Sequence, residues 1–176
     1  MNTALFIGRF QPFHLGHLSV IHEILAENDH VIIGIGSSEQ NFMRENPLTA
    51  GERFQLIKAA LKEANISAEK YSIIPIPNIN NYAIWVNHVN TYVPPYSRLY
   101  TGSEIVRACY ENKYSMLKNN SDHGPEITQL KRNLKICATE IRQKIINNEP
   151  WEKFVPKAVA KLLHSWEIPK RLKTIG

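Results

Sequence analysis

Apolar positions along the chain fall into two patterns, short continuous runs and stripes at helical spacing. The continuous runs predict four buried strands, at residues 4–8, 30–36, 71–76 and 97–101. The helical stripes predict helices over residues 17–28, 49–64, 82–93 and 104–111. Because these strands and helices alternate, we expect an α/β fold with a parallel sheet, flanking helices and right-handed crossovers.

The remainder of the chain is more polar. Residues 112–135 predict an irregular excursion with room for one short strand or helix. Two helices are expected beyond it, over 139–147 and 155–166, and Pro169 then introduces a basic tail that we expect to be solvated. We predict a single domain over residues 1–176, with a core at about 1–147 and a C-terminal helix and basic tail at 151–176.

Composition narrows the classes of protein. The chain has 176 residues, 43% hydrophobic and 21% charged, which fits one globular domain and excludes disorder. No apolar run is long enough to span a membrane and no signal peptide is visible, so we expect a cytoplasmic protein without a membrane partner. A net charge of +5 suits an anionic partner such as a nucleotide, a phosphate ester or a nucleic acid, without choosing among them.

Candidate chemistry is concentrated between the first strand and the first helix, in the segment GRFQPFHLGH. Ligands of parallel α/β sheets bind at the carboxyl ends of strands, and a helix N-terminus there suits phosphate. Gly8 and Gly16 allow the backbone to approach a ligand closely. His14 and His17 are spaced to face one anion, and Arg9 adds a guanidinium fork that matches phosphate oxygens.

This segment resembles the H-x-G-H motif of the nucleotidylyltransferases, and its longer form resembles the archaeal-type nicotinamide mononucleotide (NMN) adenylyltransferases. Further stretches match that family in type and order: ENPLTAGER at 45–53, Ile84 to Val86, Pro94-Pro95, ICATEIR at 136–142 and VPKAV at 155–159. The resemblance therefore covers nearly the whole chain.

The resemblance implies a Rossmann-like nucleotidylyltransferase fold with a small C-terminal helical portion. It implies transfer of AMP from ATP to the phosphate of NMN, giving NAD and pyrophosphate, with nicotinic acid mononucleotide as a further acceptor. Since the acceptor phosphate is already ionised at neutral pH, no general base is needed, and Mg²⁺ is expected to be held mainly by the ATP phosphates. The family further implies a homo-oligomer, such as a hexamer.

The implied site falls into three groups. The catalytic group is His14, His17 and Arg142. The ATP-binding group is Gly8, Arg9, Phe10, Gly16, Gly102, Ser103, Cys137 and Thr139. The NMN-binding group is Ser37, Arg44, Arg53, Asn81, Tyr82 and Trp85. Thr139 is expected to cap its helix, Cys137 stands where the family usually has serine, and no residue is expected to ligate a metal.

Several of these residues have a second interpretation. Trp85 either stacks on the nicotinamide ring or belongs to the core, and Arg44 either meets the acceptor phosphate or is solvated. Arg53 either binds phosphate or braces its loop. His14 and His17 have a spacing that can also serve a metal, although the sequence offers no obvious third ligand.

Two alternative functions stay open. Another enzyme of the same superfamily, such as a pantetheine-phosphate adenylyltransferase or a cytidylyltransferase, usually carries threonine and phenylalanine where this chain has Arg9-Phe10-Gln11. A non-catalytic nucleotide-binding regulator or an RNA-binding module would also use the positive charge. The sequence has no ribonucleoprotein aromatic motif and no helix-turn-helix pattern, so we expect no nucleic-acid partner.

Overall fold

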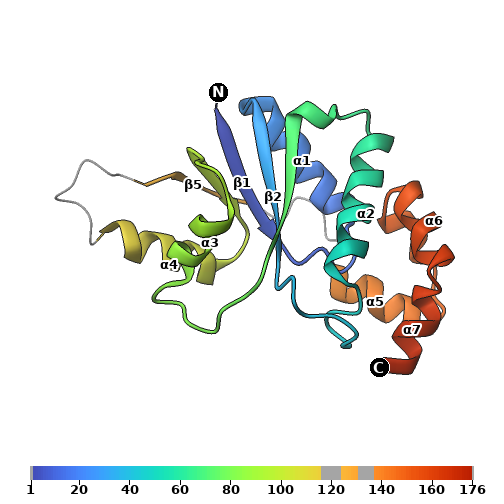
Figure 1. Ribbon diagram of the computed structural model, residues 1–176. Coiled ribbons are helices and arrows are strands. Elements are labelled where there is room, and N and C mark those ends of the chain that lie inside the picture. Colours follow the sequence, from blue (N-terminus) through green and yellow to red (C-terminus); the bar gives the residue numbers. More distant parts are fainter. Residues whose placement is uncertain (1, 116–123, 131–136, 176) are drawn as a thin grey trace.

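The computed structural model describes residues 2–115, 124–130 and 137–175, whose five strands form one parallel sheet in the order β3-β2-β1-β4-β5 (Figure 1). The strands are β1 (Thr3–Gly8), β2 (His30–Gly36), β3 (Tyr71–Ile76), β4 (Arg98–Thr101) and β5 (Glu126–Gln129). The four strands predicted from the continuous apolar runs are confirmed. The expected α/β fold with a parallel sheet and flanking helices is confirmed as well.

The strand order creates a switch point beside β1. This central strand pairs with β2 on one side and with β4 on the other. The chain builds β2 and β3 outward on the first side and then crosses to β4 on the second. At such a reversal the loops after neighbouring strands diverge, which leaves a crevice at the carboxyl ends of β1 and β4.

Helices cover both faces of the sheet (Figure 1). On one side of the sheet lie α1 (Leu15–Glu27), α2 (Ala50–Glu63) and α5 (Ala138–Ile146), and α6 (Lys157–Ser165) and α7 (Ile168–Ile175) pack against α2 and α5. The other side packs against α3 (Trp85–Tyr92) and α4 (Glu104–Ser115), and short 3₁₀ turns lie at Ala68–Lys70 and Glu152–Phe154. Within the described parts of the chain, no helix is long and apolar enough to cross a membrane.

Side chains of β1 alternate between the two cores, as the pleat of a strand requires. Ala4 and Phe6 point into the larger core with α1 and α2, whereas Leu5 points into the smaller core with α3 and α4. The strand is thus buried on both faces, which explains why it reads as an unbroken apolar run rather than as an alternating one.

Helix boundaries follow local capping chemistry. The capping box expected before α2 is present: the Glu52 amide donates to Thr49 Oγ1 at 3.1 Å, and the Thr49 amide donates to Glu52 Oε2 at 2.9 Å. The predicted helix over 82–93 is shorter in the structure and begins at Trp85. Its N-cap, Ile84, has no side chain that can accept from the first amides, so the residues before it form a turn.

The stretch predicted as an irregular excursion contains more structure than its polarity indicates. Helix α4 continues to Ser115, and Glu126–Gln129 adds β5 to the sheet, parallel to β4. Arg98 on β4 and Glu126 on β5 form an ion pair at 3.0 Å between Nε and Oε2. The sequence left room for one short strand or helix here, but an edge strand needs few apolar residues, so the hydrophobic pattern did not give its type or bounds. Residues 116–123 and 131–136 of the stretch lie outside the described part of the chain.

The basic tail expected after Pro169 is a helix, α7, and the prediction of a solvated tail is wrong. Pro169 is its second residue, where a proline nitrogen has no helical hydrogen bond to lose. Ile168 and Leu172 lie four residues apart on one face and are both buried in the larger core. The proline, which we interpreted as a stop, therefore lies at the start of a new helix.

Candidate active site

A cavity of about 370 Å³ lies at the switch point between the carboxyl ends of β1 and β4. It is lined by the loop after β1, the start of α1, the residues after β4 and the start of α5. Every residue of the predicted catalytic and ATP-binding groups lines it, and none of the six predicted NMN-binding residues does. The structure thus brings the first two groups together from segments 8–17, 102–103 and 137–142, while the roles of their members stay predictions.

Gly8 and Phe10 shape the loop that leads from β1 into the cavity. A Cβ atom at position 8 would meet the Phe10 ring at 2.9 Å, so only glycine fits there. Phe10 itself adopts a left-handed backbone, with φ of 51°, and its side chain is buried. The strained turn places the Phe10 ring against His17, with ring centroids 4.8 Å apart, and Phe13 contacts the same imidazole at 5.4 Å.

His14 and His17 form a reciprocal cap at the start of α1. The His17 amide donates to Nδ1 of His14 at 3.3 Å, and the His14 amide donates to Nδ1 of His17 at 3.2 Å. Their rings stack with centroids 3.6 Å apart. Because a backbone amide can only donate, both Nδ1 atoms are acceptors and the proton of each neutral ring sits on Nε2. The cap therefore leaves Nε2–H as the ring donor available to a ligand in the cavity.

Burial keeps both imidazoles neutral in the ligand-free protein. It lowers the pKa of His14 to about 4. The pKa of His17 is lowered well below its ordinary value, first by burial and then by the neighbouring charge of His14. Neutral imidazoles with fixed tautomers are hydrogen-bond donors ready for an anion, without the repulsion that two adjacent cations would suffer.

These depressed values predict a dependence of stability on pH. Between pH 6.5 and about 4 the unfolded chain binds protons at His14 that the folded chain does not, so stability is complete above pH 6.5 and falls as the pH drops. We expect the free energy of unfolding to lose about 2 kcal/mol through His14 between pH 7.5 and pH 5. Urea titrations of the wild type and of His14→Asn, which keeps an acceptor for the cap, measure this difference.

The exposed His22 on the same helix provides the control, as His22→Asn removes an imidazole outside the cavity. A His14→Asn protein with the same loss of stability in acid as the wild type would show that this residue is not the source.

Arg142 joins the two sides of the cavity. It is buried, and Nη1 donates to the Gln11 carbonyl at 2.8 Å while Nη2 donates to Thr139 Oγ1 at 3.2 Å. Burial, and next the charge of Arg9, lower the pKa of Arg142, which stays protonated at neutral pH as arginine does in proteins. The guanidinium is therefore a fixed positive charge one turn inside α5, facing the same space as the histidine pair.

The start of α5 differs from the prediction. Cys137, and not Thr139, is the N-cap, and Thr139 is the second helical residue, whose hydroxyl accepts from Arg142. Burial raises the pKa of the Cys137 thiol, but the amides of Thr139 and Glu140 outweigh it, so the value lies below the ordinary one. The first residues of α5 and of α1 thus both line the cavity, and the positive ends of two helix dipoles at one cavity favour bound anions.

Arg53 braces the loop after β2, and its predicted contact with the mononucleotide is corrected by its geometry. The side chain is fully buried, and burial lowers its pKa to about 10. Its five N–H donors all meet backbone carbonyls, which belong to Arg9, Gly36, Ser37, Ser38, Gln40 and Thr49. No donor is left for a substrate phosphate, so of the two interpretations the structure supports the brace.

The other predicted NMN-binding residues follow β2 and β3, on the same edge of the sheet as the cavity. Ser37 directly follows β2 in a left-handed conformation, and Arg44 lies exposed in the next loop. Trp85 is half-buried beside the smaller core, and its indole Nε1 donates to Asn78 Oδ1 at 3.2 Å. Asn81 and Tyr82 lie exposed just before Trp85. None of these residues lines the cavity, so their role in binding the mononucleotide stays a prediction.

Sequence reasoning missed two parts of the site. Gln11 is buried, and its amide holds Leu48 through reciprocal bonds of 2.9 Å to the Leu48 carbonyl and from the Leu48 amide. Ser19, Val20 and Glu23 also line the cavity. Helical spacing could have identified these three residues, since they follow Gly16 by three, four and seven positions and therefore share its face of α1.

Within the residues that the structure describes, no group of three histidine, cysteine, aspartate or glutamate side chains could hold a metal ion. In the described part of the chain, the cavity is lined by one carboxylate, that of Glu23, and by the side chains of His14, His17, Arg9 and Arg142, whose N–H groups suit phosphate oxygens. A parallel sheet with such a site at its switch point is typical of α/β nucleotide-binding proteins, and the segment from His14 to His17 resembles the motif of the nucleotidylyltransferases.

Comparisons with known proteins agree. Residues 5–144 match the cytidylyltransferase-like family. Over 174 residues the chain is 39% identical to the nicotinamide-nucleotide adenylyltransferase of Methanococcus aeolicus, covering 98% of this chain and 94% of that one. The protein of the same name from Archaeoglobus fulgidus is 39% identical over 183 residues, covering 98% and 97%. The chain belongs to the cytidylyltransferase-like family and, within it, to the nicotinamide-nucleotide adenylyltransferases.

Solved structures support the fold. The bifunctional NMN adenylyltransferase/ADP ribose pyrophosphatase of Francisella tularensis superimposes with a TM-score of 0.77 at 22% identity, over 98% of this chain. The chain spans about half of that protein, 52% of its length.

Proposed function

We propose that this protein transfers AMP from ATP to the phosphate of NMN, forming NAD and releasing pyrophosphate. The observation that carries the proposal is the cavity itself, where His14, His17 and Arg142 gather beside the starts of α1 and α5. Family membership over the full chain supports the same reaction.

The reaction needs alignment more than acid–base chemistry. A phosphate oxygen of NMN forms a bond to the α-phosphorus of ATP, while the bond from that phosphorus to the bridging oxygen breaks and pyrophosphate leaves with the electron pair. The nucleophile is already an anion, so no side chain has to remove a proton. Glu140, the acid of the ICATEIR stretch, is exposed and does not line the cavity, which is consistent with this.

The residues of the cavity stabilise the charge that develops. Nε2–H of His14 and of His17 can donate to phosphate oxygens, and a bound triphosphate favours the protonated rings, which opposes the effect of burial. Arg142 adds a fixed charge near the α-phosphate, and the amides at the starts of α1 and α5 complete the cradle. All these donors are in place before the substrate arrives, so little reorganisation is needed during the reaction.

The two substrates are proposed to occupy neighbouring strand ends. ATP binds in the cavity between β1 and β4, while NMN binds beside it, over the ends of β2 and β3, between Arg44 and Trp85. Trp85 has an indole face that suits the cationic pyridinium, a contact of about 0.5–2 kcal/mol. A site with few carboxylates would leave Mg²⁺ to be held mainly by the ATP phosphates, and the ion would supply compensation for the charge of the leaving pyrophosphate.

An assay with a panel of acceptors tests the proposal. The protein is given ATP with NMN, nicotinic acid mononucleotide, phosphopantetheine or glycerol phosphate, and pyrophosphate release is measured together with NAD formation. We expect pyrophosphate and NAD in equal amounts with NMN, and none with phosphopantetheine. A faster reaction with phosphopantetheine, or with CTP in place of ATP, would contradict the proposal. Use of nicotinic acid mononucleotide, a homo-oligomeric assembly and a cytoplasmic location stay predictions.

A further inference from the structure

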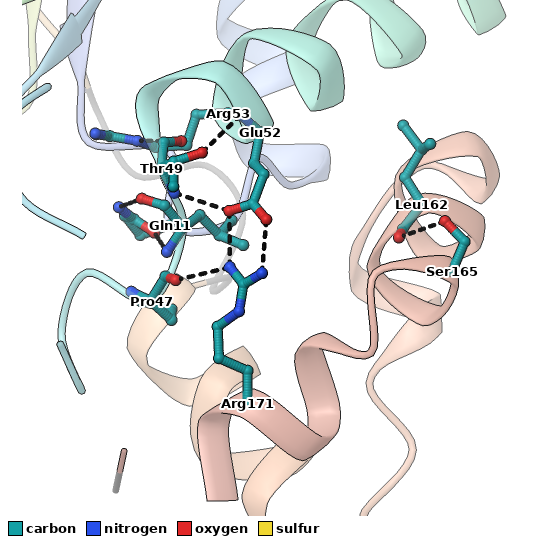
Figure 2. A network of polar contacts seen from close by, with 9 residues as sticks. Gln11, Pro47, Thr49, Glu52, Arg53, Leu162, Ser165 and Arg171 are labelled. Carbon is teal, nitrogen blue, oxygen red and sulfur yellow. Dashed lines mark hydrogen bonds and ion pairs between the residues drawn. The ribbon is translucent and has the colours of Figure 1, made fainter. Parts of the chain in front are cut away.

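The loop between β2 and α2, residues 37–49, is tied to the C-terminal helix α7 by Arg171 (Figure 2). Nη1 and Nη2 of Arg171 meet the two carboxylate oxygens of Glu52 at 2.8 and 2.7 Å, and Nη1 also donates to the Pro47 carbonyl at 3.2 Å. Both charged side chains are about four-fifths shielded from solvent, with exposed fractions of 19% and 18%. Because this ion pair is bidentate and shielded from solvent, it holds Arg171 and Glu52 in a defined geometry.

Arg171 is one of three clamps on this loop. Arg53 holds its first residues through the carbonyls of Ser37 and Ser38, and Gln11 holds Leu48 near its end. Gln11 lines the cavity itself, and Arg53 also donates to the carbonyl of Arg9, which lines it too. Arg171 is different, because its hydrogen-bond partners Pro47 and Glu52 do not line the cavity.

Arg171 also touches the exposed tip of the loop. Its guanidinium lies over the Phe42 ring, with 4.6 Å from Cζ to the ring centroid, although the Phe42 side chain is 54% exposed. One side chain thus fixes the tip at Phe42 and the end at Pro47. Arg44 lies between these two points, exposed and with no hydrogen bond to any other residue that the structure describes.

Helix α7 is a firm base for such a clamp. Ile168 and Leu172 anchor it in the larger core, and Lys173 Nζ donates to Asn148 Oδ1 in the turn after α5. The hydrogen bonds from Arg171 and Thr49 outweigh burial and lower the pKa of the Glu52 carboxyl, so the pair stays charged across the neutral range.

We propose that Arg171 is a positioning residue for the acceptor substrate: it holds residues 42–47 so that Arg44 is presented to the phosphate of the mononucleotide. The proposal rests on the proposed function. It adds to the acceptor site a residue that lies 119 positions along the chain from its ion-pair partner Glu52. We expect loss of Arg171 to weaken binding of NMN and not of ATP, since the residues that line the ATP cavity belong to other segments than residues 42–47. Loss of the clamp frees Arg44 from its position and leaves the donors around ATP in place.

Steady-state kinetics of Arg171→Gln test the proposal with ATP and NMN as substrates. We expect the KM for NMN to rise about tenfold while the KM for ATP changes less than about twofold. Arg171→Lys keeps a charge but loses the fork and the flat stacking face, so a smaller rise is expected. Lys170→Gln, which removes an exposed cation from the same helix, is expected to change neither constant.

A double-mutant cycle with Arg44→Ala separates positioning from general stability. If Arg171 acts through Arg44, adding Arg171→Gln to Arg44→Ala produces no further rise in the KM for NMN. Independent, multiplying effects would overturn the proposal. So would equal rises in both KM values, or a lowered Tm with unchanged kinetics, since each would make Arg171 a structural residue only. Wild-type turnover, measured first, tests the proposed function separately, because its absence would leave no KM to compare.

Discussion

Replacement of His17 by asparagine is expected to lower kcat by about 10²–10³-fold while the KM for ATP changes by less than about threefold. Asparagine places an amide oxygen where Nδ1 of the imidazole lies, so it can still accept from the His14 amide and keep the cap. It has no atom at the position of Nε2. The variant therefore removes the donor that acts on developing charge, and steady-state constants for ATP and NMN measure the loss.

His17→Gln is the matched variant, because its amide nitrogen lies near the position of Nε2 while its oxygen cannot take the place of Nδ1. We expect part of the rate to return, about tenfold over His17→Asn, together with a lower Tm from the damaged cap. Rate and stability thus move in opposite directions between the two variants. Unchanged kcat and a raised KM for ATP in both would reduce His17 to a ground-state contact.

Replacement of Arg142 by glutamine is expected to lower kcat by about 10²-fold, because the cavity loses its fixed charge beside the α-phosphate. Arg142→Lys keeps the charge but cannot hold the Gln11 carbonyl and Thr139 Oγ1 at once, so we expect an intermediate rate. Steady-state and single-turnover rates with ATP and NMN measure both.

A loss of stability accompanies either change and has to be separated from the chemistry. An unpaired Gln11 carbonyl in this buried position costs about 1–3 kcal/mol, which denaturant titration detects. Lys144→Gln, on the same helix but pointing at Glu149, controls for the loss of a cation from α5. A normal kcat in Arg142→Gln, with only the stability lowered, would assign Arg142 to the loop scaffold instead.

Sequence reasoning succeeded where structure and chemistry are local. The segment from Gly8 to His17 combines a strand end, a glycine turn and a helix start. Its residues are therefore close together in space because they are close in sequence, independently of the rest of the fold. Strands β1, β2 and β4 are largely buried and therefore left continuous apolar runs. Thr49 and Glu52 cap a helix by contacts three residues apart, which a sequence displays directly.

The features that were missed depend on partners far along the chain. Gln11 holds Leu48, 37 positions away, and Arg171 holds Glu52, 119 positions away. Neither pair leaves a periodic pattern, because one polar side chain can meet any carbonyl or carboxylate that the fold brings near. Helix α7 was overlooked, and the type and bounds of β5 were left open, for a related reason: each gains its stability from a neighbour that is already formed rather than from its own propensity.

The histidine cap has a consequence for protein engineering. Helix capping boxes ordinarily use serine or threonine followed three residues later by glutamate or glutamine, and stability-guided redesign would place those residues at positions 14 and 17 of this chain. Such a redesign removes two buried imidazoles that resist protonation, and it satisfies the same two backbone amides. It also erases both Nε2 donors. Automated thermostabilisation of this enzyme should therefore keep positions 14 and 17 fixed, since we expect the substitutions that score best for the helix to lower turnover.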